Sequence, residues 1–305
     1  MTLRRPAETL RFSEGGDFRF NHAGFPVSGT GAGGLDSGYG IRLEGIFMLI
    51  RRIKNYLTDM THLRKDDVIL AAFPKTGSTW VRFILCNLIS LNEWNGKVVD
   101  FDTLNDTLFS FGQGRLPQAW PYHTLPRVVV THRLYRWPLF RDRKAVLVIR
   151  DPRDAMISRY HYESKKKPEH HPFEGSLLDF LQHPRLGLSS YFRHYLAWKD
   201  HVQAVVKYED LKKCPEEEFQ KLLHILGIQP DPAALGESIQ RSSIEKVRAL
   251  EDQAGHKRRE ASHVEGFKFT RNGRAGQWRE VYTPEEIRVY EEYRRRYRFD
   301  LYNGG

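Results

Sequence analysis

The sequence predicts one α/β domain in which helices flank a largely parallel central sheet. The first observation is a set of short apolar runs, at 68–73, 127–131, 145–149 and 202–207, that are typical of buried strands. The second is that helix-length segments or long crossovers separate these runs, as parallel strands require. The third is a P-loop-like turn that joins the first run to an apolar, helix-length segment at 78–91.

Composition and charge narrow the class of protein. Of 305 residues, 40% are apolar and 28% are charged, which is ordinary for a globular chain. Lys and Arg outnumber Asp and Glu by 48 to 38, and this excess favours anionic partners such as phosphorylated ligands, nucleic acid or an acidic membrane face. Cys86 and Cys214 form no disulfide pattern, which suits a reducing compartment and predicts a cytoplasmic location.

The N-terminal part of the chain differs from the rest. Residues 1–45 are rich in Gly and Ser and predict a flexible arm, followed by one domain over 46–305. Residues 1–12 lack the apolar segment of a secretory signal, and no apolar run is long enough to cross a membrane. The segment 46–60, IFMLIRRIKNYLTDM, predicts an amphipathic helix. It could touch a membrane, but docking on the core is the favoured interpretation.

The turn after the first predicted strand, KTGST, has the composition of a phosphate-binding cradle. It leads into a helix whose first backbone N–H groups lack intrahelical partners. Lys75 adds a full charge, and the hydroxyls of Thr76, Ser78 and Thr79 add hydrogen-bond donors. The pattern G-x-x-x-x-G-K-[ST] is absent because the Lys precedes Gly77, so the usual signature of a Mg²⁺–nucleotide site is missing.

Three polar side chains follow predicted strands directly: Lys75, His132 and Arg150. Because ligands of parallel sheets bind at the carboxyl ends of the strands, we expect these three residues to share one edge. Asp151-Pro-Arg-Asp then predicts a helix start, with Ser158 farther along that helix. The pattern therefore indicates an anion site with a histidine beside it.

Several separated segments resemble the cytosolic-type sulfotransferases, a family that takes its sulfuryl group from 3′-phosphoadenosine 5′-phosphosulfate (PAPS). The resemblance spans roughly residues 66–298, and its segments occur in the family's order. They are FPKTGSTW at 73–80, the strand end at His132, IRDPRDAMISRYHY at 149–162, YED at 208–210 and FTRNGRAGQW at 269–278.

The resemblance implies a role for each matching residue. His132 is the general base that takes the proton of the acceptor, and Lys75 offsets charge on the leaving phosphate oxygen. Because Lys and Arg neutralise the leaving group, no metal is expected. The implied donor-binding residues are Lys75, Thr76, Gly77, Ser78, Thr79, Trp80, Arg150, Ser158, Tyr208, Ser242, Arg271, Asn272 and Gly273.

The sequence also departs from the family pattern. Val130 stands where the family often has Lys, which leaves Arg133 as a candidate source of charge. Asn272 replaces a second Lys in the Gly-rich segment. The family's dimer motif is matched only in part, by Arg279 and Thr283, which predicts a monomer or a weak homodimer.

The acceptor is predicted to be a small, partly apolar molecule with a hydroxyl group or, as the less favoured choice, an amine. An irregular stretch at 92–126 carries many aromatic residues, and aromatic side chains on loops beside a site can line a ligand pocket. The residues proposed for this pocket are Phe109, Phe111, Trp120 and Tyr122.

Two alternatives from other classes remain at this point. A nucleotide kinase of the P-loop type would use ATP and Mg²⁺, but the missing G-K-[ST] order and the second basic site count against it. A non-catalytic basic module that binds nucleic acid or membrane would explain the charge of +10, but would not explain a histidine beside an anion cradle. The favoured reading is an enzyme with no nucleic-acid partner and no membrane-spanning segment.

Overall fold

The computed structural model describes residues 37–254, 260–271 and 273–302. By its internal contacts the chain divides into two compact units, residues 1–48 and 49–305. Helix α1 (Ser37–His62) crosses this division and begins before the predicted position 46. Asn272 and the predicted arm up to residue 36 lie outside the described residues.

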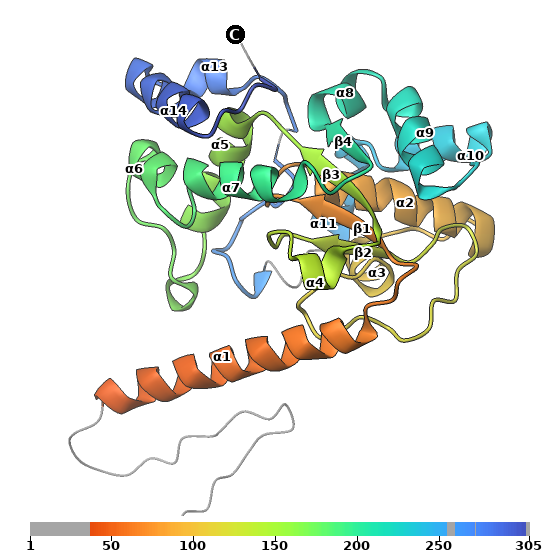
Figure 1. Cartoon of the computed structure of the whole chain (residues 1–305), viewed down its shortest axis with the longest axis horizontal. Helices are drawn as coiled ribbons and strands as arrows, with labels where there is room; N and C mark the ends of the chain where they lie inside the picture. The colour runs from red at the N-terminus through yellow and green to blue at the C-terminus, as the bar shows by residue number, and fades with distance from the viewer. Residues whose placement is uncertain (1–36, 255–259, 272, 303–305) are drawn as a thin grey trace, which may run out of the picture. The chain divides into compact units, whose positions relative to one another are not determined.

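The central sheet has four strands in the order β2-β1-β3-β4 (Figure 1). These strands are β1 (Val68–Ala72), β2 (Val128–Thr131), β3 (Lys144–Ile149) and β4 (Ala204–Lys207). All three pairings are parallel, which confirms the predicted fold class. The carboxyl ends of all four strands therefore meet at one edge.

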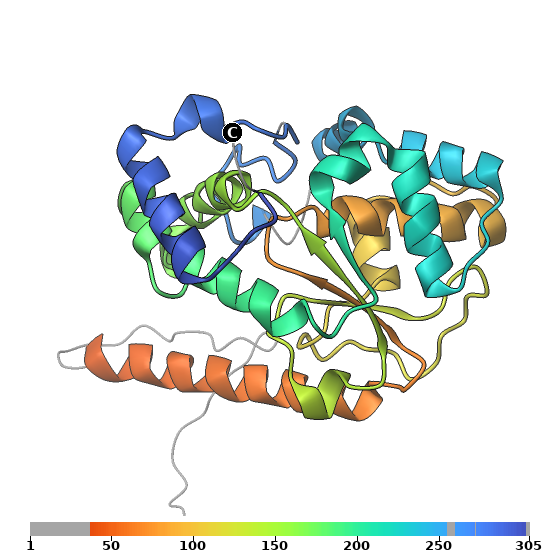
Figure 2. The same cartoon turned by 45° about the horizontal axis from the view of Figure 1, so that its top comes forward.

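Different helices cover the two faces of the sheet, because alternate strand residues point to opposite sides. Val68, Leu70 and Val130 join a core built with α2 (Ser78–Glu93) and α9 (Pro215–Leu226). Ile69 and Leu147 join another core that contains Trp198 of α7 (Leu188–Trp198). The ribbons of these helices are labelled around the sheet in Figures 1 and 2. The helices after α1 are α2 (Ser78–Glu93), α3 (Phe101–Thr107), α4 (Trp137–Phe140), α5 (Pro152–Ser164), α6 (Leu177–Gln182), α7 (Leu188–Trp198), α8 (Tyr208–Lys213), α9 (Pro215–Leu226), α10 (Pro232–Arg241), α11 (Ile244–Ala254), α13 (Trp278–Val281) and α14 (Pro284–Arg296), with a 3₁₀ turn at Pro168–His170.

Local signals set the helix ends where the sequence predicted them. Asp151 caps α5 by accepting a hydrogen bond from the N–H of Arg153 at 2.9 Å. Thr283 and Glu286 form the predicted capping box of α14. The stretch at 92–126, in contrast, is not wholly irregular, because the side chain of Asp100 caps the short helix α3.

The interpretation that the apolar side of α1 docks on the core is wrong for its C-terminal half. Asp59 and Tyr56 face the domain: the buried Asp59 carboxylate accepts hydrogen bonds from the N–H groups of Gly112 and Gly114 at 2.6 and 2.9 Å. Apolar residues of this half, among them Leu49, Ile53 and Leu57, lie on another side of the helix and are exposed. A buried carboxylate bound by backbone donors, and not apolar packing, therefore holds this part of α1. No helix of the described part of the chain is long and apolar enough to cross a bilayer.

We expect Asp67→Ala to lower the free energy of unfolding by about 3–5 kcal/mol, because it leaves a buried guanidinium without its partner. Asp67 and Arg127 form a bidentate pair at 2.6 and 2.7 Å, and their side chains are 0% and 3% exposed. The matched control is Asp66→Ala, which removes an ion pair with Arg64 from a carboxylate that is 68% exposed. That change should cost less than about 1 kcal/mol. Urea unfolding of both variants measures the difference, and equal losses would contradict the argument.

Candidate active site

A cavity of about 620 Å³ opens at the carboxyl edge of the sheet. Its lining includes the residue that follows each strand or lies one turn beyond it: Lys75 after β1, His132 after β2, Arg150 after β3 and Tyr208 after β4. The predicted convergence at one edge is therefore present. The volume is in the range of small-molecule sites.

The turn between β1 and α2 has an unusual backbone. Lys75 and Gly77 have φ values of 73° and 102°, in the left-handed region. Gly77 is required here, because a Cβ at this position would lie 2.5 Å from Cδ2 of Tyr208. Gly77 is the N-cap of α2 and has no side chain that could accept from the first N–H groups of that helix. An anion at this point would meet those N–H groups and the positive end of the helix dipole.

Thr76 departs from its expected role as a donor to the ligand. It is fully buried, and its hydroxyl donates to the carbonyl oxygens of Phe73 and Val148 at 2.8 and 3.1 Å. Thr76 therefore ties the turn to β3 and is not part of the cavity lining. The hydroxyl-bearing residues of the turn that do line the cavity are Ser78 and Thr79.

The ammonium group of Lys75 lies between two aromatic rings at the cavity. Its Nζ atom is 3.7 Å from the ring centre of Phe269 and 5.2 Å from that of Tyr162. Cations are attracted to the faces of such rings. These two residues belong to segments that the sequence singled out, but neither was predicted as a site residue.

His132 is exposed and lines the cavity. Its Nδ1 atom is 2.7 Å from the carbonyl oxygen of Ala72, the last residue of β1. Because a carbonyl oxygen only accepts, Nδ1 must carry the proton in a neutral ring. The lone pair is then on Nε2, which is the state that a general base requires.

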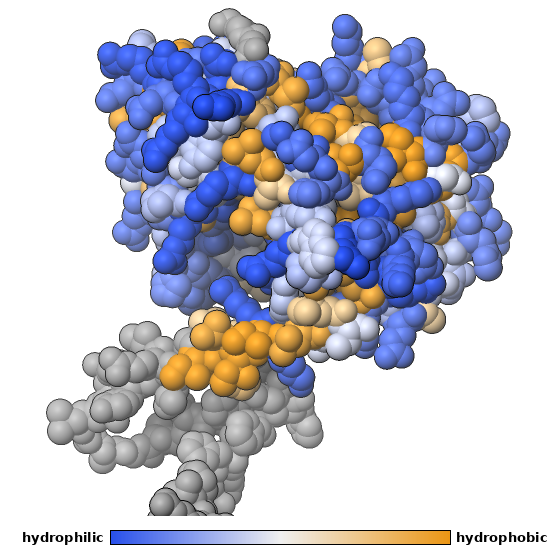
Figure 3. Space-filling model, in the orientation of Figure 1, coloured by the Kyte–Doolittle hydropathy of each residue, from blue (hydrophilic) through white to orange (hydrophobic). Residues whose placement is uncertain are grey.

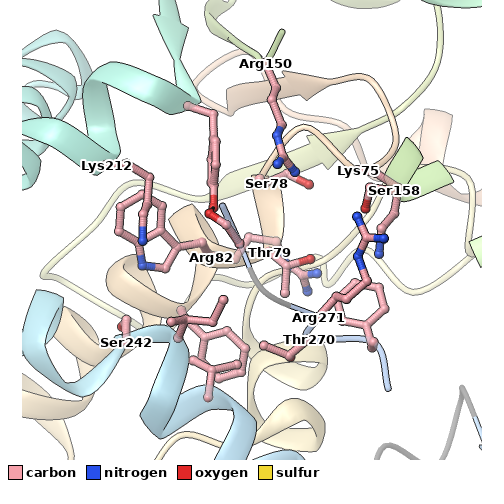
Figure 4. A pocket seen from close by; sticks show the side chains of 18 of the residues that line it. Lys75, Ser78, Thr79, Arg82, Arg150, Ser158, Lys212, Ser242, Thr270 and Arg271 are labelled. Carbon is pink, nitrogen blue, oxygen red and sulfur yellow. Dashed lines mark hydrogen bonds between the residues drawn. The ribbon is translucent and has the colours of Figure 1, made fainter. Parts of the chain in front are cut away.

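Two guanidinium groups, those of Arg150 and Arg271, belong to the cavity lining. Arg150 is buried, donates to the carbonyl oxygen of Arg274 at 2.7 Å and lies 4.7 Å above the ring of Tyr208. Burial, and then the positive charge of Arg150, lower the pKa of Arg271. Nε of Arg150 is buried without a hydrogen-bond partner among the described residues. A pair of like charges with an unused donor suits a doubly charged anion. In Figure 4, Arg150, Ser158, Lys75 and Arg271 lie on one side of the cavity.

Asp154 holds the segment after residue 270 against α5. Its carboxylate is fully buried and accepts from the N–H groups of Gly276 and Trp278 at 2.6 and 3.0 Å. Burial raises the pKa of this carboxyl, and Arg150 at 3.8 Å opposes that change. Asp154 thus brings Arg271 and Arg150, which are far apart in sequence, to the same wall.

Aromatic rings form another wall of the cavity. Trp80 and Tyr208 meet edge to face with their centres 5.8 Å apart, and the hydroxyl of Tyr208 donates to the carbonyl oxygen of Gly273 at 2.7 Å. Ser242 lines the cavity, but its hydroxyl donates to the carbonyl oxygen of Ser238 at 2.7 Å. Lys212, which lies 5.7 Å above the ring of Trp80, was not predicted. Its position two residues after the YED segment was the available signal.

The four aromatic residues predicted for the acceptor pocket do not line this cavity. Phe111 packs edge to face on Tyr56 and Phe140, and Trp120 packs on Tyr122 with centres 4.8 Å apart. Phe109, like these, packs against a hydrophobic core. The same stretch contributes Asn105, Ser110 and Gln113 to the lining instead.

Val130 is buried in the core, and Arg133 does not replace the missing Lys. The Arg133 guanidinium lies 4.7 Å above the ring of Tyr56, and Arg133 is not part of the cavity lining. Among the residues that the structure describes, Arg82 also lines the cavity, besides the cations already named.

Comparison with known proteins agrees with this geometry. Residues 65–299 match the family model described as the sulfotransferase domain. The chain is 27% identical over 254 residues to flavonol 3-sulfotransferase of Flaveria bidentis, covering 73% of this chain and 78% of that protein. It is 24% identical over 244 residues to sulfotransferase 2A6 of Rattus norvegicus, covering 75% of this chain and 84% of that protein.

Solved structures show the same fold. Mouse sulfotransferase SULT7A1 complexed with PAP (3′,5′-ADP) superposes with a TM-score of 0.59 at 18% identity, over 82% of this chain and 91% of that one. Retinol dehydratase in complex with androsterone and inactive cofactor PAP superposes with a TM-score of 0.61 at 17% identity, over 82% of this chain and 86% of that one. The family model covers most of the chain, and it agrees with the fold and with the family predicted from the sequence. The chain therefore belongs to the sulfotransferase family.

Proposed function

We propose that this enzyme transfers the sulfuryl group of PAPS to a hydroxyl group of a small, partly apolar acceptor. An amine is the less favoured acceptor. The observation that carries the proposal is that His132, whose Nδ1 atom contacts the carbonyl oxygen of Ala72, lines the same cavity as the cradle at Lys75 and as Arg150 and Arg271. The donor has a 5′-phosphosulfate and a 3′-phosphate and so needs two separate anion sites.

The two anion sites of the cavity fit these two groups. The cradle offers Lys75, Ser78, Thr79 and the start of α2 to the 5′-phosphosulfate. Arg150, Ser158 and Arg271 offer charge and hydrogen bonds to the 3′-phosphate, which would relieve the mutual repulsion of the two guanidinium groups. Trp80 and Tyr208 lie where an adenine ring could stack. Solved relatives bound to PAP support this choice of donor.

The proposed reaction is an in-line displacement at sulfur. His132 accepts the proton of the acceptor hydroxyl as its oxygen forms a bond to sulfur and the bond from sulfur to the phosphate oxygen breaks. Lys75 offsets the negative charge that the leaving phosphate oxygen gains. A positioned base typically contributes about 10²–10⁴-fold, and charge stabilisation supplies much of the rest. No step needs a metal ion.

The acceptor contacts that we propose are residues of the cavity lining. Ser110 and Gln113 would provide polar groups, and the rings of Phe269 and Tyr162 would provide apolar surface. This mixture suits an acceptor with a hydroxyl on a partly apolar frame. A monomeric or weakly dimeric state and a cytoplasmic location remain predictions.

Thermal-shift titration with 3′,5′-ADP (PAP), the product of the donor, tests the proposal. At about 100 times its Kd, a ligand that binds only the folded state stabilises by about 2.7 kcal/mol. We expect such a shift with PAP and a much smaller shift with 5′-ADP plus Mg²⁺. A response to 5′-ADP with Mg²⁺ that equals or exceeds the response to PAP would favour a nucleotide kinase. No response to either would contradict the donor assignment.

A further inference from the structure

The C-terminal half of α1 carries an uncovered apolar stripe. Leu49, Ile50, Ile53 and Leu57 are 58%, 58%, 50% and 53% exposed, although isolated apolar side chains of this size are usually more buried. Their spacing of three and four residues places them on one side of the helix, and Met60 extends the row. Figure 3 shows apolar surface along α1. We call these five residues the α1 stripe.

The α1 stripe is not the side that holds the helix to the domain. Asp59 accepts from three backbone N–H groups of the segment 112–116, and Tyr56 packs on Phe111. At 100° per residue, Asp59 and Tyr56 lie within a quarter turn of each other, and the stripe lies on the neighbouring and opposite sides. Contacts within residues 49–305 therefore hold the C-terminal half of α1 and leave the stripe exposed.

The charge around the α1 stripe is of one sign. Arg51, Arg52 and Lys54 are exposed and make no ion pair within the described ranges. Residues 45–58 contain no acidic residue, and Asp59, the one acid in the rest of α1, is buried against backbone donors. On the helical wheel, Lys54 lies beside one edge of the stripe, and Arg52 lies beyond Tyr56 at the other edge, on the side of Asp59. An apolar stripe with cations to either side of it is typical of a helix that lies in a membrane interface.

We propose that α1 docks on an anionic lipid bilayer, with its stripe among the acyl chains and its cations at the headgroups. A bilayer with negative headgroups complements both features, and the net charge of +10 adds long-range attraction. A second copy of this chain fits less well. A two-fold pairing of two stripes would bring their flanking cations together without acids to oppose them.

The proposal has a consequence for the active site. Asp59 is bound directly to the segment 112–116, and Gln113 of that segment lines the cavity. A docked α1 therefore holds part of the cavity lining close to the membrane surface. This consequence rests on the proposed function, whereas the docking itself does not.

Vesicle co-sedimentation of the full chain tests the docking. The vesicles contain phosphatidylcholine alone or with about 30 mol% phosphatidylserine. We expect the wild type to bind the anionic vesicles at least about tenfold more tightly than the neutral ones at low salt. Ile53→Ser/Leu57→Ser should lower binding to the anionic vesicles at least about tenfold, because it removes two apolar groups from the interface. Arg52→Gln/Lys54→Gln should weaken the same binding and reduce its salt dependence.

The control changes exposed apolar residues outside α1, in Val98→Ser/Ile287→Ser. Val98 and Ile287 are 65% and 36% exposed and lie outside the cavity lining, so vesicle binding should be unchanged. The PAP-induced thermal shift of each variant shows that it is folded, and it separates failed docking from failed donor binding. Wild-type binding that is equal for both vesicles, or unchanged by Ile53→Ser/Leu57→Ser, would overturn the proposal. So would sedimentation equilibrium showing a dimer that this double change dissociates.

Discussion

His132→Ala is expected to lower kcat for sulfuryl transfer by about 10²–10⁴-fold, the usual contribution of a positioned general base. The reason is that the hydrogen bond from Nδ1 to the carbonyl oxygen of Ala72 leaves Nε2 as the acceptor for the proton of the hydroxyl. Because His132 is exposed, its removal should not disturb folding. Steady-state kinetics with PAPS and a phenolic acceptor measure the effect.

The binding of PAP separates a chemical role of His132 from a structural one. His132→Ala should bind PAP with an affinity within a few-fold of that of the wild type, because the ring is not placed among the donor-binding cations. The matched control is His224→Ala on the surface of α9, which should leave kcat unchanged. Transfer at a near wild-type rate in His132→Ala would show that another group takes the proton.

Arg150→Ala is expected to remove the preference of the enzyme for a 3′-phosphorylated nucleotide. Truncating one partner of a buried, hydrogen-bonded charge pair typically costs about 2–5 kcal/mol, so the Kd for PAP should rise by roughly 30- to 5,000-fold. The Kd for 5′-AMP, which lacks the 3′-phosphate, should change little. Isothermal titration calorimetry of both nucleotides measures the difference.

Measuring the Kd for both PAP and 5′-AMP distinguishes the loss of a contact with the 3′-phosphate from a loss of affinity that comes from distortion of the site. Arg150 also donates to the carbonyl oxygen of Arg274 and lies over Tyr208, so its removal could disturb the wall itself. A disturbed wall would weaken both nucleotides. The control Arg193→Ala, an exposed position on α7, should alter neither. Equal losses for PAP and 5′-AMP would show that Arg150 does not contact the 3′-phosphate.

Much of the fold could be predicted because its signals are local. The strands are short runs of buried residues, and the starts of α5 and α14 are set by Asp151 and Thr283 through bonds to residues two or three positions away. Parallel pairing then places Lys75, His132 and Arg150 at one edge without further information. The helices α3, α4 and α6 are too short for a period of 3.6 residues to be visible in sequence.

The roles of single side chains were harder to predict from the sequence, because they depend on partners far along the chain. The hydroxyl of Thr76 donates to the carbonyl oxygen of Val148. The guanidinium of Arg133 stacks on Tyr56, which lies before the first strand. Aromatic residues on a loop can face a cavity or a core, and Phe111 and Trp120 face cores. No pattern within their own segments distinguishes these outcomes.

The sequence by itself determined the class of fold, the family, the edge of the sheet that carries the site and the segments that form it. The fold class and the edge of the sheet follow from periodicity and turn chemistry, which act over a few residues, whereas the family and its segments follow from the resemblance of the quoted motifs. The tertiary structure alone decided that Nδ1 of His132 contacts the carbonyl oxygen of Ala72, that the charge of Arg150 lowers the pKa of Arg271, and that the α1 stripe is exposed. Each of these depends on a hydrogen bond, a charge or a buried surface between residues that only the folded chain brings together.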